Sequence, residues 1–317
     1  MSLSCPKVSI IVAIFNAGAT LSRCLDSVLG QSFQDYEVIA VDDGSTDDSW
    51  KILCNYRDAD PRFRIFRQDN RGVSATRQFG LGKAQGEFTM HLDADDWIEQ
   101  DMLSSMCEKA DSDGADWVIC GLKIHTCTGD YSDMQRPVSM NPEEVFGQML
   151  CGTLHGSLCN KLIRRRLYGD FGVSFPKGVD CGEDLYVCLS ILSKGIIPGH
   201  VPFALYHYDK TQNNDSVTNK WFDYPVQKRV ALIEAIEPMI TPATRHSFNN
   251  YVGRIAYDAL FCTRAYCPNY RSLFAPYSTY IMECDMPAHK RLLIRLGLHG
   301  FRLPLRQIRH FFFRNMA

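Results

Sequence analysis

Short apolar runs alternate with helix-like repeats over the first 125 residues of the chain. Residues 8–15, Val-Ser-Ile-Ile-Val-Ala-Ile-Phe, are almost entirely apolar, as expected for a strand covered on both faces. Similar runs lie at 37–41, 62–67, 88–92 and 115–124. Between them, apolar residues recur at helical spacing in 20–31, 74–83 and 99–111. This alternation predicts an α/β fold, a βαβ series with a mostly parallel sheet flanked by helices.

The pattern changes beyond Gly129, where helix-like and irregular stretches follow one another. Helices are predicted around 142–151, 183–194, 221–240 and 245–264. We therefore expect an α/β domain over residues 1–220 and a helical C-terminal region over residues 221–317.

Composition and cysteine use narrow the class of protein. Of 317 residues, 45% are hydrophobic and 22% charged, which is typical of a globular chain. The net charge of -2 gives no argument for a nucleic-acid partner. The 13 cysteines are odd in number and form no Cys-x-x-Cys pair, and the first residues lack the apolar run of a signal peptide. We expect a reducing, cytoplasmic location.

No membrane-spanning segment is expected. The longest uncharged run near the start, residues 8–22, is shorter than the roughly 20 apolar residues that a spanning helix needs.

The last 30 residues differ from the rest of the chain in charge. After Asp285 there is no acidic residue, and seven basic ones follow: Lys290, Arg291, Arg295, Arg302, Arg306, Arg309 and Arg314. On a helix, one face would carry Leu305, Ile308, Phe311 and Phe312, with the arginines on another. This pattern favours contact of 287–317 with an anionic membrane surface. The alternative is a packed helix with solvated arginines.

Polar side chains follow three of the predicted strands. The strand ends are Phe15-Asn16, Asp42-Asp43 and Asp93-Ala94-Asp95-Asp96. Ligands of open α/β sheets bind beyond the carboxyl ends of strands, although a single aspartate is also a common turn former. Three carboxylates within four residues favour a divalent cation, and Mg²⁺ or Mn²⁺ is usually held by one or two carboxylates plus substrate phosphates.

The absence of their motifs argues against two classes of nucleotide-binding enzyme. The chain has no Walker A sequence and no G-x-G-x-x-G after a strand, so neither a P-loop enzyme nor a dinucleotide dehydrogenase is expected.

Four motifs, in order, carry a resemblance to a known family: Val-Ser-Ile-Ile-Val-Ala-Ile-Phe-Asn (8–16), Val-Asp-Asp-Gly-Ser-Thr-Asp-Asp-Ser (41–49), Asn-Arg-Gly-Val-Ser-Ala-Thr-Arg (70–77) and Leu-Asp-Ala-Asp-Asp-Trp (92–97). Together they resemble family 2 glycosyltransferases of the GT-A fold. Looser similarity continues through 159–162 and 182–186, and none is claimed beyond about residue 220.

The resemblance implies an inverting transferase with a nucleotide-diphosphate sugar donor, UDP being the expected nucleotide. It places Ala13, Phe15 and Asn16 near the nucleotide, with Phe15 where many members carry a base-stacking tyrosine. Asp43 would accept a hydrogen bond from the base. Arg77 would contact the diphosphate, although by itself it could be a surface helix residue.

The resemblance also implies a metal ion at the carboxylate triplet. Asp93 would contact the ribose or a metal-bound water, and Asp95 would bind Mn²⁺ or Mg²⁺. Asp96 is the alternative metal ligand to Asp95, because family members differ in which carboxylate of the triplet binds the ion.

The acceptor hydroxyl needs a base, and Gly182-Glu183-Asp184 matches the family's Glu-Asp pair. The resemblance assigns Asp184 as the base, with Glu183 as the fallback. Adjacent acids at a helix start could instead interact with the helix dipole. Lys161 and the polar segment 206–217, which includes Tyr206, His207 and Lys210, are further candidates by position alone.

The expected function is transfer of a single sugar to a hydroxyl of a glycan or lipid-linked acceptor, in cell-envelope polysaccharide synthesis. The Gln-x-x-Arg-Trp motif of processive synthases in the family is absent. One alternative is a sugar nucleotidyltransferase, which should carry a Gly-rich basic loop after the first strand, unlike residues 15–18. The other is a non-catalytic glycan- or lipid-binding protein, which would have lost some of the acids.

Overall fold

The computed structural model describes residues 5–176, 181–211, 225–260 and 269–300. The chain forms two compact units. The first comprises Met1–Met149 and Thr153–Asn213, and the second comprises Leu150–Gly152 and Asn214–Ala317.

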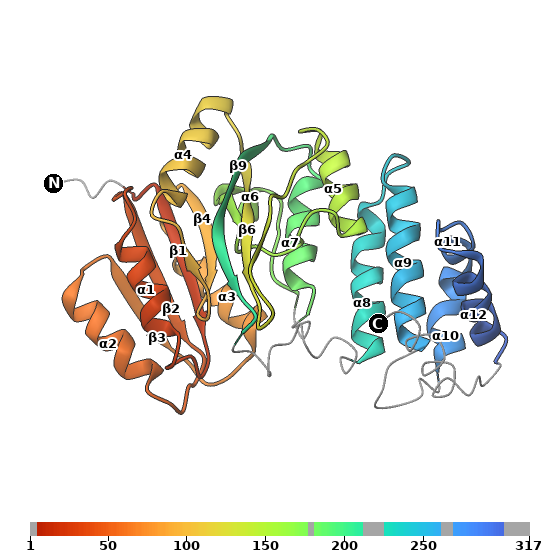
Figure 1. Cartoon of the computed structure of the whole chain (residues 1–317), viewed down its shortest axis with the longest axis horizontal. Coiled ribbons are helices and arrows are strands. Elements are labelled where there is room, and N and C mark those ends of the chain that lie inside the picture. The colour runs from red at the N-terminus through yellow and green to blue at the C-terminus, as the bar shows by residue number, and fades with distance from the viewer. Residues whose placement is uncertain (1–4, 177–180, 212–224, 261–268, 301–317) are drawn as a thin grey trace. The chain divides into compact units, whose positions relative to one another are not determined.

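The sheet of the first unit begins with four parallel strands in the order β3-β2-β1-β4 (Figure 1). Their bounds are Phe63–Arg67 for β3, Tyr36–Asp42 for β2, Val8–Ile14 for β1 and Phe88–Asp93 for β4. Every residue of β1 and β2 is buried or partly buried, as the continuous apolar runs predict. The α/β class and the parallel pairing expected from the sequence are confirmed.

The other half of the sheet is mixed. It continues as β8 (Lys161–Arg164), β6 (Trp117–His125), β9 (Pro198–Asp209) and β5 (Trp97–Ile98), and β7 (Tyr131–Asp133) pairs with β6. β6 is parallel to β9 and antiparallel to β8. The sequence pattern missed β8 and β9, and Pro198, Gly199 and Pro202 interrupt the alternation in β9.

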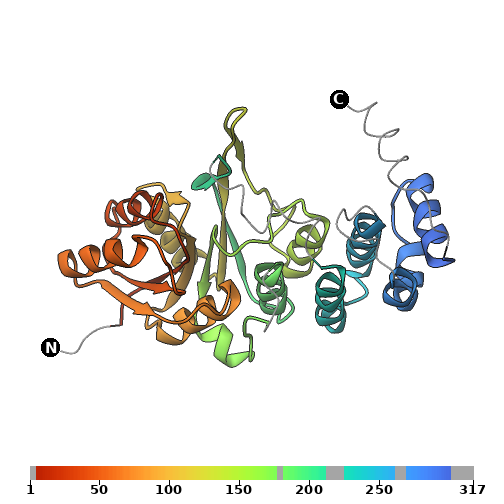
Figure 2. The same cartoon turned by 90° about the horizontal axis from the view of Figure 1, so that it is seen from below.

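The described residues of the first unit form seven helices, of which α5 ends within the second unit. Their bounds are α1 Leu21–Leu29, α2 Ser49–Ala59, α3 Val73–Lys83, α4 Met102–Asp113, α5 Pro142–Cys151, α6 Arg166–Asp170 and α7 Glu183–Leu192. Figure 2 shows helices on both faces of the sheet. The helix predicted over 99–111 begins only at Met102, because the chain still pairs with β9 at Ile98 and the Glu99 amide donates to the Leu205 carbonyl.

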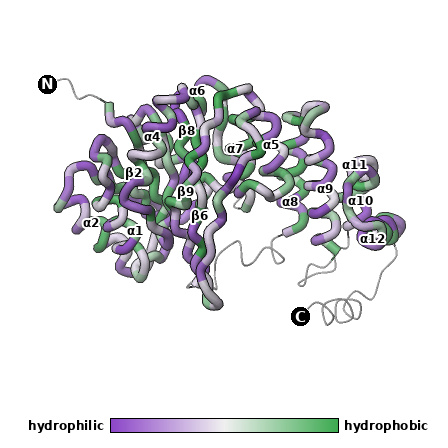
Figure 3. Tube along the Cα trace, turned by 45° about the horizontal axis from the view of Figure 1, so that its top comes forward, coloured by the Kyte–Doolittle hydropathy of each residue, from purple (hydrophilic) through white to green (hydrophobic). Residues whose placement is uncertain are grey.

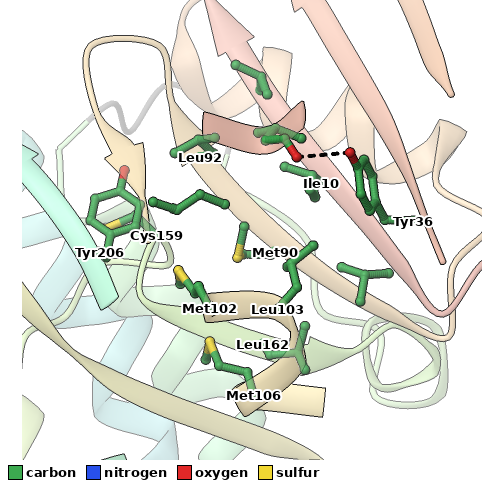
Figure 4. Packing of buried hydrophobic residues seen from close by; sticks show 14 of the residues in the cluster. Ile10, Tyr36, Met90, Leu92, Met102, Leu103, Met106, Cys159, Leu162 and Tyr206 are labelled. Atoms are coloured by element: carbon green, nitrogen blue, oxygen red, sulfur yellow. Dashed lines mark hydrogen bonds between the residues drawn. The ribbon is translucent and has the colours of Figure 1, made fainter. Parts of the chain in front are cut away.

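The core of the first unit lies between the sheet and helices α1 and α4 (Figure 4). Ile10, Met90 and Leu92 from the strands meet Met102 and Met106 of α4, and all five are buried. Tyr36, also buried here, donates a hydrogen bond from its hydroxyl to the carbonyl of Val28, at 2.9 Å. This packing fixes the strands whose ends carry the polar side chains.

The second unit is helical in its described residues. It contains α8 (Val226–Ile236), α9 (Arg245–Leu260), α10 (Tyr270–Phe274), α11 (Ser278–Met282), α12 (Ala288–Leu298) and the 3₁₀ helices η2 (Glu237–Met239) and η3 (Ala275–Tyr277). Hydrophobic and hydrophilic residues alternate along α9 and α12 (Figure 3). A Cβ on Gly253 of α9 would lie 2.8 Å from the Cys284 sulfur, so glycine permits this close approach.

Parts of the sequence predictions fall outside the described residues. These are the ends of the predicted helices at 221–224 and 261–264, and the tail from 301 with Leu305, Ile308, Phe311 and Phe312. Within the described ranges, no helix combines the length and apolarity needed to cross a bilayer.

Candidate functional site

The strand register brings the three polar strand ends together. Ala13 of β1 lies opposite Val41 of β2 on one side and opposite Asp93 of β4 on the other. Asp42 is the partner of Ile14. The loops that follow β1, β2 and β4 therefore leave the sheet at one edge, where ligands of α/β sheets bind.

The loop after β1 is tied to the turn after β2. Asn16 adopts a left-handed conformation with φ 50°, and its side-chain oxygen accepts a hydrogen bond from the Thr46 amide at 2.9 Å. Its own amide donates to Ser45 Oγ at 2.9 Å. The preceding Phe15 side chain is 51% exposed. An exposed aromatic ring at a strand end offers a surface on which a planar group can stack.

Asp43 is buried and holds the loop that leads into α3. Its Oδ1 accepts hydrogen bonds from Gln68 Nε2 at 2.7 Å and from the Arg71 amide at 3.0 Å. Its Oδ2 accepts one from the Gly72 amide at 2.9 Å. Asp43 therefore sets the position of the loop that leads into α3.

Arg77 is the centre of a buried ion cluster. Its Nη2 lies 2.7 Å from Asp93 Oδ1, and its Nη1 lies 2.7 Å from Glu183 Oε1 and 2.6 Å from Asp184 Oδ1. The guanidinium side chain is only 6% exposed. The structure thus brings together four of the residues singled out in the sequence, from β4, α3 and α7, although more than 100 positions separate Arg77 from Asp184.

The ion cluster shifts the pKa of each carboxyl on α7. Burial, with the neighbouring charge of Asp184, raises the pKa of Glu183 well above its usual range. Burial also raises the pKa of Asp184, although the charge of Arg77 opposes this. Burial by itself would lower the Arg77 pKa, but the charges of Asp184, Asp93 and Glu183 raise it. Arg77 is therefore permanently charged, while the two acids on α7 bind protons more readily than exposed acids do.

The backbone around Asp184 fixes its direction. Gly182 precedes α7 with φ 87°, a conformation that favours glycine, so the chain turns sharply into the helix. Asp184 Oδ2 accepts a hydrogen bond from the Leu158 amide at 3.2 Å, and Oδ1 faces Arg77. A carboxylate held at both oxygens has little rotational freedom.

The carboxylates of the 93–96 turn differ in their surroundings. Asp96 is fully buried, and its oxygens accept hydrogen bonds from the Tyr206 hydroxyl at 2.6 Å and the Asp209 amide at 2.8 Å. Asp95 is only partly buried; burial and then the charge of Asp93 raise its pKa to about 6. Asp93 is 33% exposed at its side chain.

The carboxylates of this turn differ in how well their surroundings suit a metal. Asp93 and Asp95 supply hard oxygen ligands next to each other, and their mutual repulsion is relieved by a cation. Asp96 uses both oxygens to hold β9. Across the described residues, no group of three or more His, Cys, Asp or Glu is arranged to hold a metal on its own. A pair of carboxylates nevertheless fits Mg²⁺ or Mn²⁺ when substrate phosphates complete the coordination.

Three further candidates have structural partners. Lys161 is buried, and its ammonium donates to the His155 carbonyl at 2.8 Å and Asn160 Oδ1 at 2.7 Å, which stabilises the loop before β8. His207 lies in β9 and hydrogen-bonds to His125 at 2.9 Å. Lys210 lies 5.0 Å from the centre of the Tyr208 ring. The rest of the polar segment, from residue 212, lies outside the described residues.

Two further residues contact the carboxylate turn. Tyr206, the first residue of the candidate segment 206–217, donates its hydroxyl to Asp96 and accepts a hydrogen bond from the Asp93 amide at 3.2 Å. Arg23 of α1 donates to the carbonyl of Asp95 at 2.6 Å. Arg23 was not predicted from the sequence, because it has the spacing of an ordinary exposed helix residue.

Comparisons with known proteins find similar sequences and a similar fold. A family model described as "Glycosyl transferase family 2" matches residues 9–172. The protein EpsH of Bacillus subtilis (strain 168) is 34% identical over 209 residues, covering 64% of this chain and 60% of EpsH. The succinoglycan biosynthesis protein ExoO of Rhizobium meliloti (strain 1021) is 29% identical over 212 residues, covering 64% of this chain and 60% of ExoO. The chain matches less than two thirds of the length of each of these relatives.

A solved structure has the same fold. The crystal structure of S. aureus TarS 1-349 in complex with UDP-GlcNAc has a TM-score of 0.69 with this chain at 18% identity, covering 93% of this chain and 88% of that one. At this identity the likeness concerns the fold alone. It confirms the fold class expected from the sequence motifs.

Proposed function

Because the chain belongs to glycosyl transferase family 2, whose model it matches over more than half of its length, we propose that it transfers a single sugar from a nucleotide-diphosphate donor to an acceptor hydroxyl. One observation supports this proposal above all. Asp93, which with Asp95 suits a metal, shares the buried ion cluster around Arg77 with Asp184. The acceptor class that we propose is a glycan or a lipid-linked glycan.

The donor site in this proposal is the edge where β1, β2 and β4 end. Phe15 offers an exposed ring for the base, beside Ala13 and Asn16, and Asp43 accepts from the base while holding the loop before α3. UDP is the proposed nucleotide, supported by the TarS structure that contains UDP-GlcNAc. Asp93 and Asp95 would hold Mn²⁺ or Mg²⁺, and Asp96 supports the turn from behind. When bound, the ion supplies positive charge that stabilises the departing nucleoside diphosphate.

Asp184 is the proposed base, with inversion at the sugar carbon. It accepts the proton of the acceptor hydroxyl as that oxygen attacks the sugar carbon from the side opposite the leaving diphosphate. Burial raises the Asp184 pKa towards the operating pH, which improves a general base. Arg77 keeps the carboxylate oriented through its 2.6 Å contact and, as a fixed cation beside Asp93, adds positive charge near the diphosphate.

The proposed setting is cell-envelope polysaccharide synthesis, which the name of the similar ExoO supports. The absence of the Gln-x-x-Arg-Trp motif of processive synthases supports the proposed transfer of one sugar per acceptor. The basic tail, 287–317, would bring the enzyme to an anionic membrane surface where a lipid-linked acceptor lies.

Product analysis tests the proposed reaction. The purified chain, with Mn²⁺, is incubated with a panel of UDP- and GDP-sugars, with and without a lipid-linked glycan fraction. Acceptor-stimulated release of a nucleoside diphosphate is expected. Release of pyrophosphate from a sugar phosphate and a nucleoside triphosphate would instead show a nucleotidyltransferase, and tight glycan binding without any release would show a non-catalytic protein.

A further inference from the structure

The turn that carries Asp93 and Asp95 is held from behind by α1. Thr20, just before that helix, donates its hydroxyl to the Ala94 carbonyl at 2.9 Å. Arg23, one turn further on, donates from Nη2 to the Asp95 carbonyl at 2.6 Å. Two successive carbonyls of the turn therefore depend on side chains of one helix end.

Arg23 also connects this turn to β9. The same nitrogen lies 2.7 Å from Asp209 Oδ2, and the Asp209 side chain is only 3% exposed. The Asp209 amide in turn donates to Asp96 Oδ1 at 2.8 Å. The guanidinium thus joins three separate parts of the chain around the backbone of Asp95.

An aromatic ring contacts the guanidinium of Arg23. The guanidinium carbon lies over the Trp97 ring, 4.0 Å from its centre. Trp97 itself stacks on His125 and on His207, each with ring centres 4.7 Å apart. The two imidazoles are nearly parallel, at 6°, and hydrogen-bonded to each other at 2.9 Å. Arg23 is therefore held by a cation–π contact as well as by its two oxygen partners.

The ion pair alone does not explain this arrangement. Arg23 is 38% exposed, so solvent weakens its pairing with the buried Asp209. The short bond to a backbone carbonyl, by contrast, fixes the peptide plane from which the Asp95 side chain departs. Rotation of that plane would move the Asp95 carboxylate, whose charge interacts with that of Asp93.

We infer that Arg23 is a positioning residue for metal binding: it orients the Asp95 carboxylate through the Asp95 carbonyl. The inference rests on the proposed function, since that function places Mn²⁺ or Mg²⁺ at Asp93 and Asp95. Groups that hold a metal ligand in place commonly contribute tenfold or more to metal affinity.

Arg62 provides a matched control. It pairs with Asp60 at 2.6 Å, and its guanidinium lies 4.3 Å from the centre of the Tyr36 ring. It precedes β3, and Tyr36 begins β2, so this pair lies at the end of the parallel strands away from Asp93. Arg62→Gln removes an ion pair and a cation–π contact, as Arg23→Gln does, but no hydrogen bond to the turn at 93–96.

The test is Mn²⁺ binding to the full chain, measured by electron paramagnetic resonance at saturating UDP, and repeated with GDP. Arg23→Gln is expected to raise the Mn²⁺ dissociation constant by about tenfold, and Arg62→Gln to leave it within about twofold of wild type. Arg23→Lys, which keeps the charge but loses the planar guanidinium, should give an intermediate value and serves if the glutamine variant does not fold. Thermal unfolding of each variant is measured in parallel.

The outcomes separate this inference from the proposed function. Lower unfolding temperatures in the Arg23 variants with unchanged Mn²⁺ affinity would overturn it, because the residue would then be structural only. Wild-type protein that binds UDP or GDP without any need for Mn²⁺ would also overturn it, while leaving the nucleotide proposal in place. Binding of neither nucleotide would overturn both.

Discussion

At the scale of single residues, charge balance explains the ion cluster around Arg77. One buried guanidinium faces three carboxyl groups, so full ionisation would leave buried negative charge without a partner. Such charge is costly in a site with little water, and proton binding relieves it. The raised pKa values of Glu183 and Asp184 follow from this arrangement. The same proton affinity suits a group that must take a proton from an acceptor hydroxyl.

Replacement of the proposed base should separate chemistry from binding. Asp184→Asn keeps the shape and the hydrogen bond from Leu158 but cannot take up the proton. We expect transfer to fall by a factor of about 10² to 10⁴, with UDP affinity within about threefold of wild type. Initial rates and calorimetric UDP titration measure the two quantities.

Glu183→Gln is the control for that prediction. Glu183 also contacts Arg77, but in the proposed mechanism it does not take up the acceptor proton. The variant should therefore retain most of the transfer rate. A severe loss in Glu183→Gln together with high activity in Asp184→Asn would move the base to Glu183.

The pH dependence of metal binding should follow Asp95. A carboxylate binds a metal only when it is ionised. Burial and the charge of Asp93 raise the Asp95 pKa to about 6, so the ionised fraction falls as the pH is lowered through that value. Affinity for Mn²⁺ with UDP should therefore be nearly constant above about pH 7 and decline steadily from about pH 6 to pH 5.

The Asp95→Asn variant separates this effect from protonation of UDP. UDP titrates equally with both proteins, so the difference between wild type and variant reports Asp95. Parallel pH curves for the two proteins would contradict the assignment of Asp95 as a ligand.

At the scale of elements, the packing of α3 on the sheet places Arg77 in the site. A Cβ on Gly80 would lie 2.6 Å from Ile11 Cγ2 of β1, closer than any side chain tolerates without movement. Gly82 on the same helix has open space around it. The two glycines therefore serve different purposes, although both interrupt a helical pattern.

Alanine at each position tests this contact. Gly80→Ala should force α3 away from β1 and lower the free energy of unfolding by about 1 to 3 kcal/mol. Gly82→Ala should raise it by up to about 1 kcal/mol, since alanine favours the helix. Urea unfolding of both variants measures the difference. Equal effects in the two variants would show that α3 does not depend on the close approach at Gly80.

The elements also show where sequence patterns are informative. The parallel strands were predictable because each is buried on both faces and therefore continuously apolar, and the strand ends gave Asp43, Asp93 and Asp95. β8 has four residues and β9 contains a bulge, so neither carries a regular period. The contact between Arg77 and Asp184 depends on how α3 and α7 pack together in the fold. The local periodicity of the sequence cannot predict such packing.

At the scale of the whole molecule, charge is separated along the chain. All residues after Asp285 that carry charge are basic, whereas acids exceed bases before it. Ile294 of α12 is fully buried and Gly297 approaches Tyr270 closely, so α12 stabilises the second unit. The residues available to contact a membrane in our proposal are therefore best sought beyond Gly300.

Truncation after Gly300 tests the membrane proposal. It removes Arg302, Arg306, Arg309 and Arg314 and leaves α12 in place. Each basic residue near an anionic surface contributes about 1 kcal/mol, so sedimentation with phosphatidylglycerol vesicles should be lost while the unfolding temperature changes little. Neutral phosphatidylcholine vesicles are the control. Undiminished sedimentation of the truncated chain would contradict the proposal.

The central claim is that the strand ends bind a nucleoside diphosphate through a metal at Asp95. Calorimetric titration of UDP and of GDP into the full chain, with Mn²⁺ and then with a chelator, tests it most directly when repeated on Asp95→Ala. We expect binding of one nucleotide that requires both Mn²⁺ and Asp95. Binding that is unchanged by the chelator and by the substitution, or no binding of either nucleotide by folded protein, would contradict it.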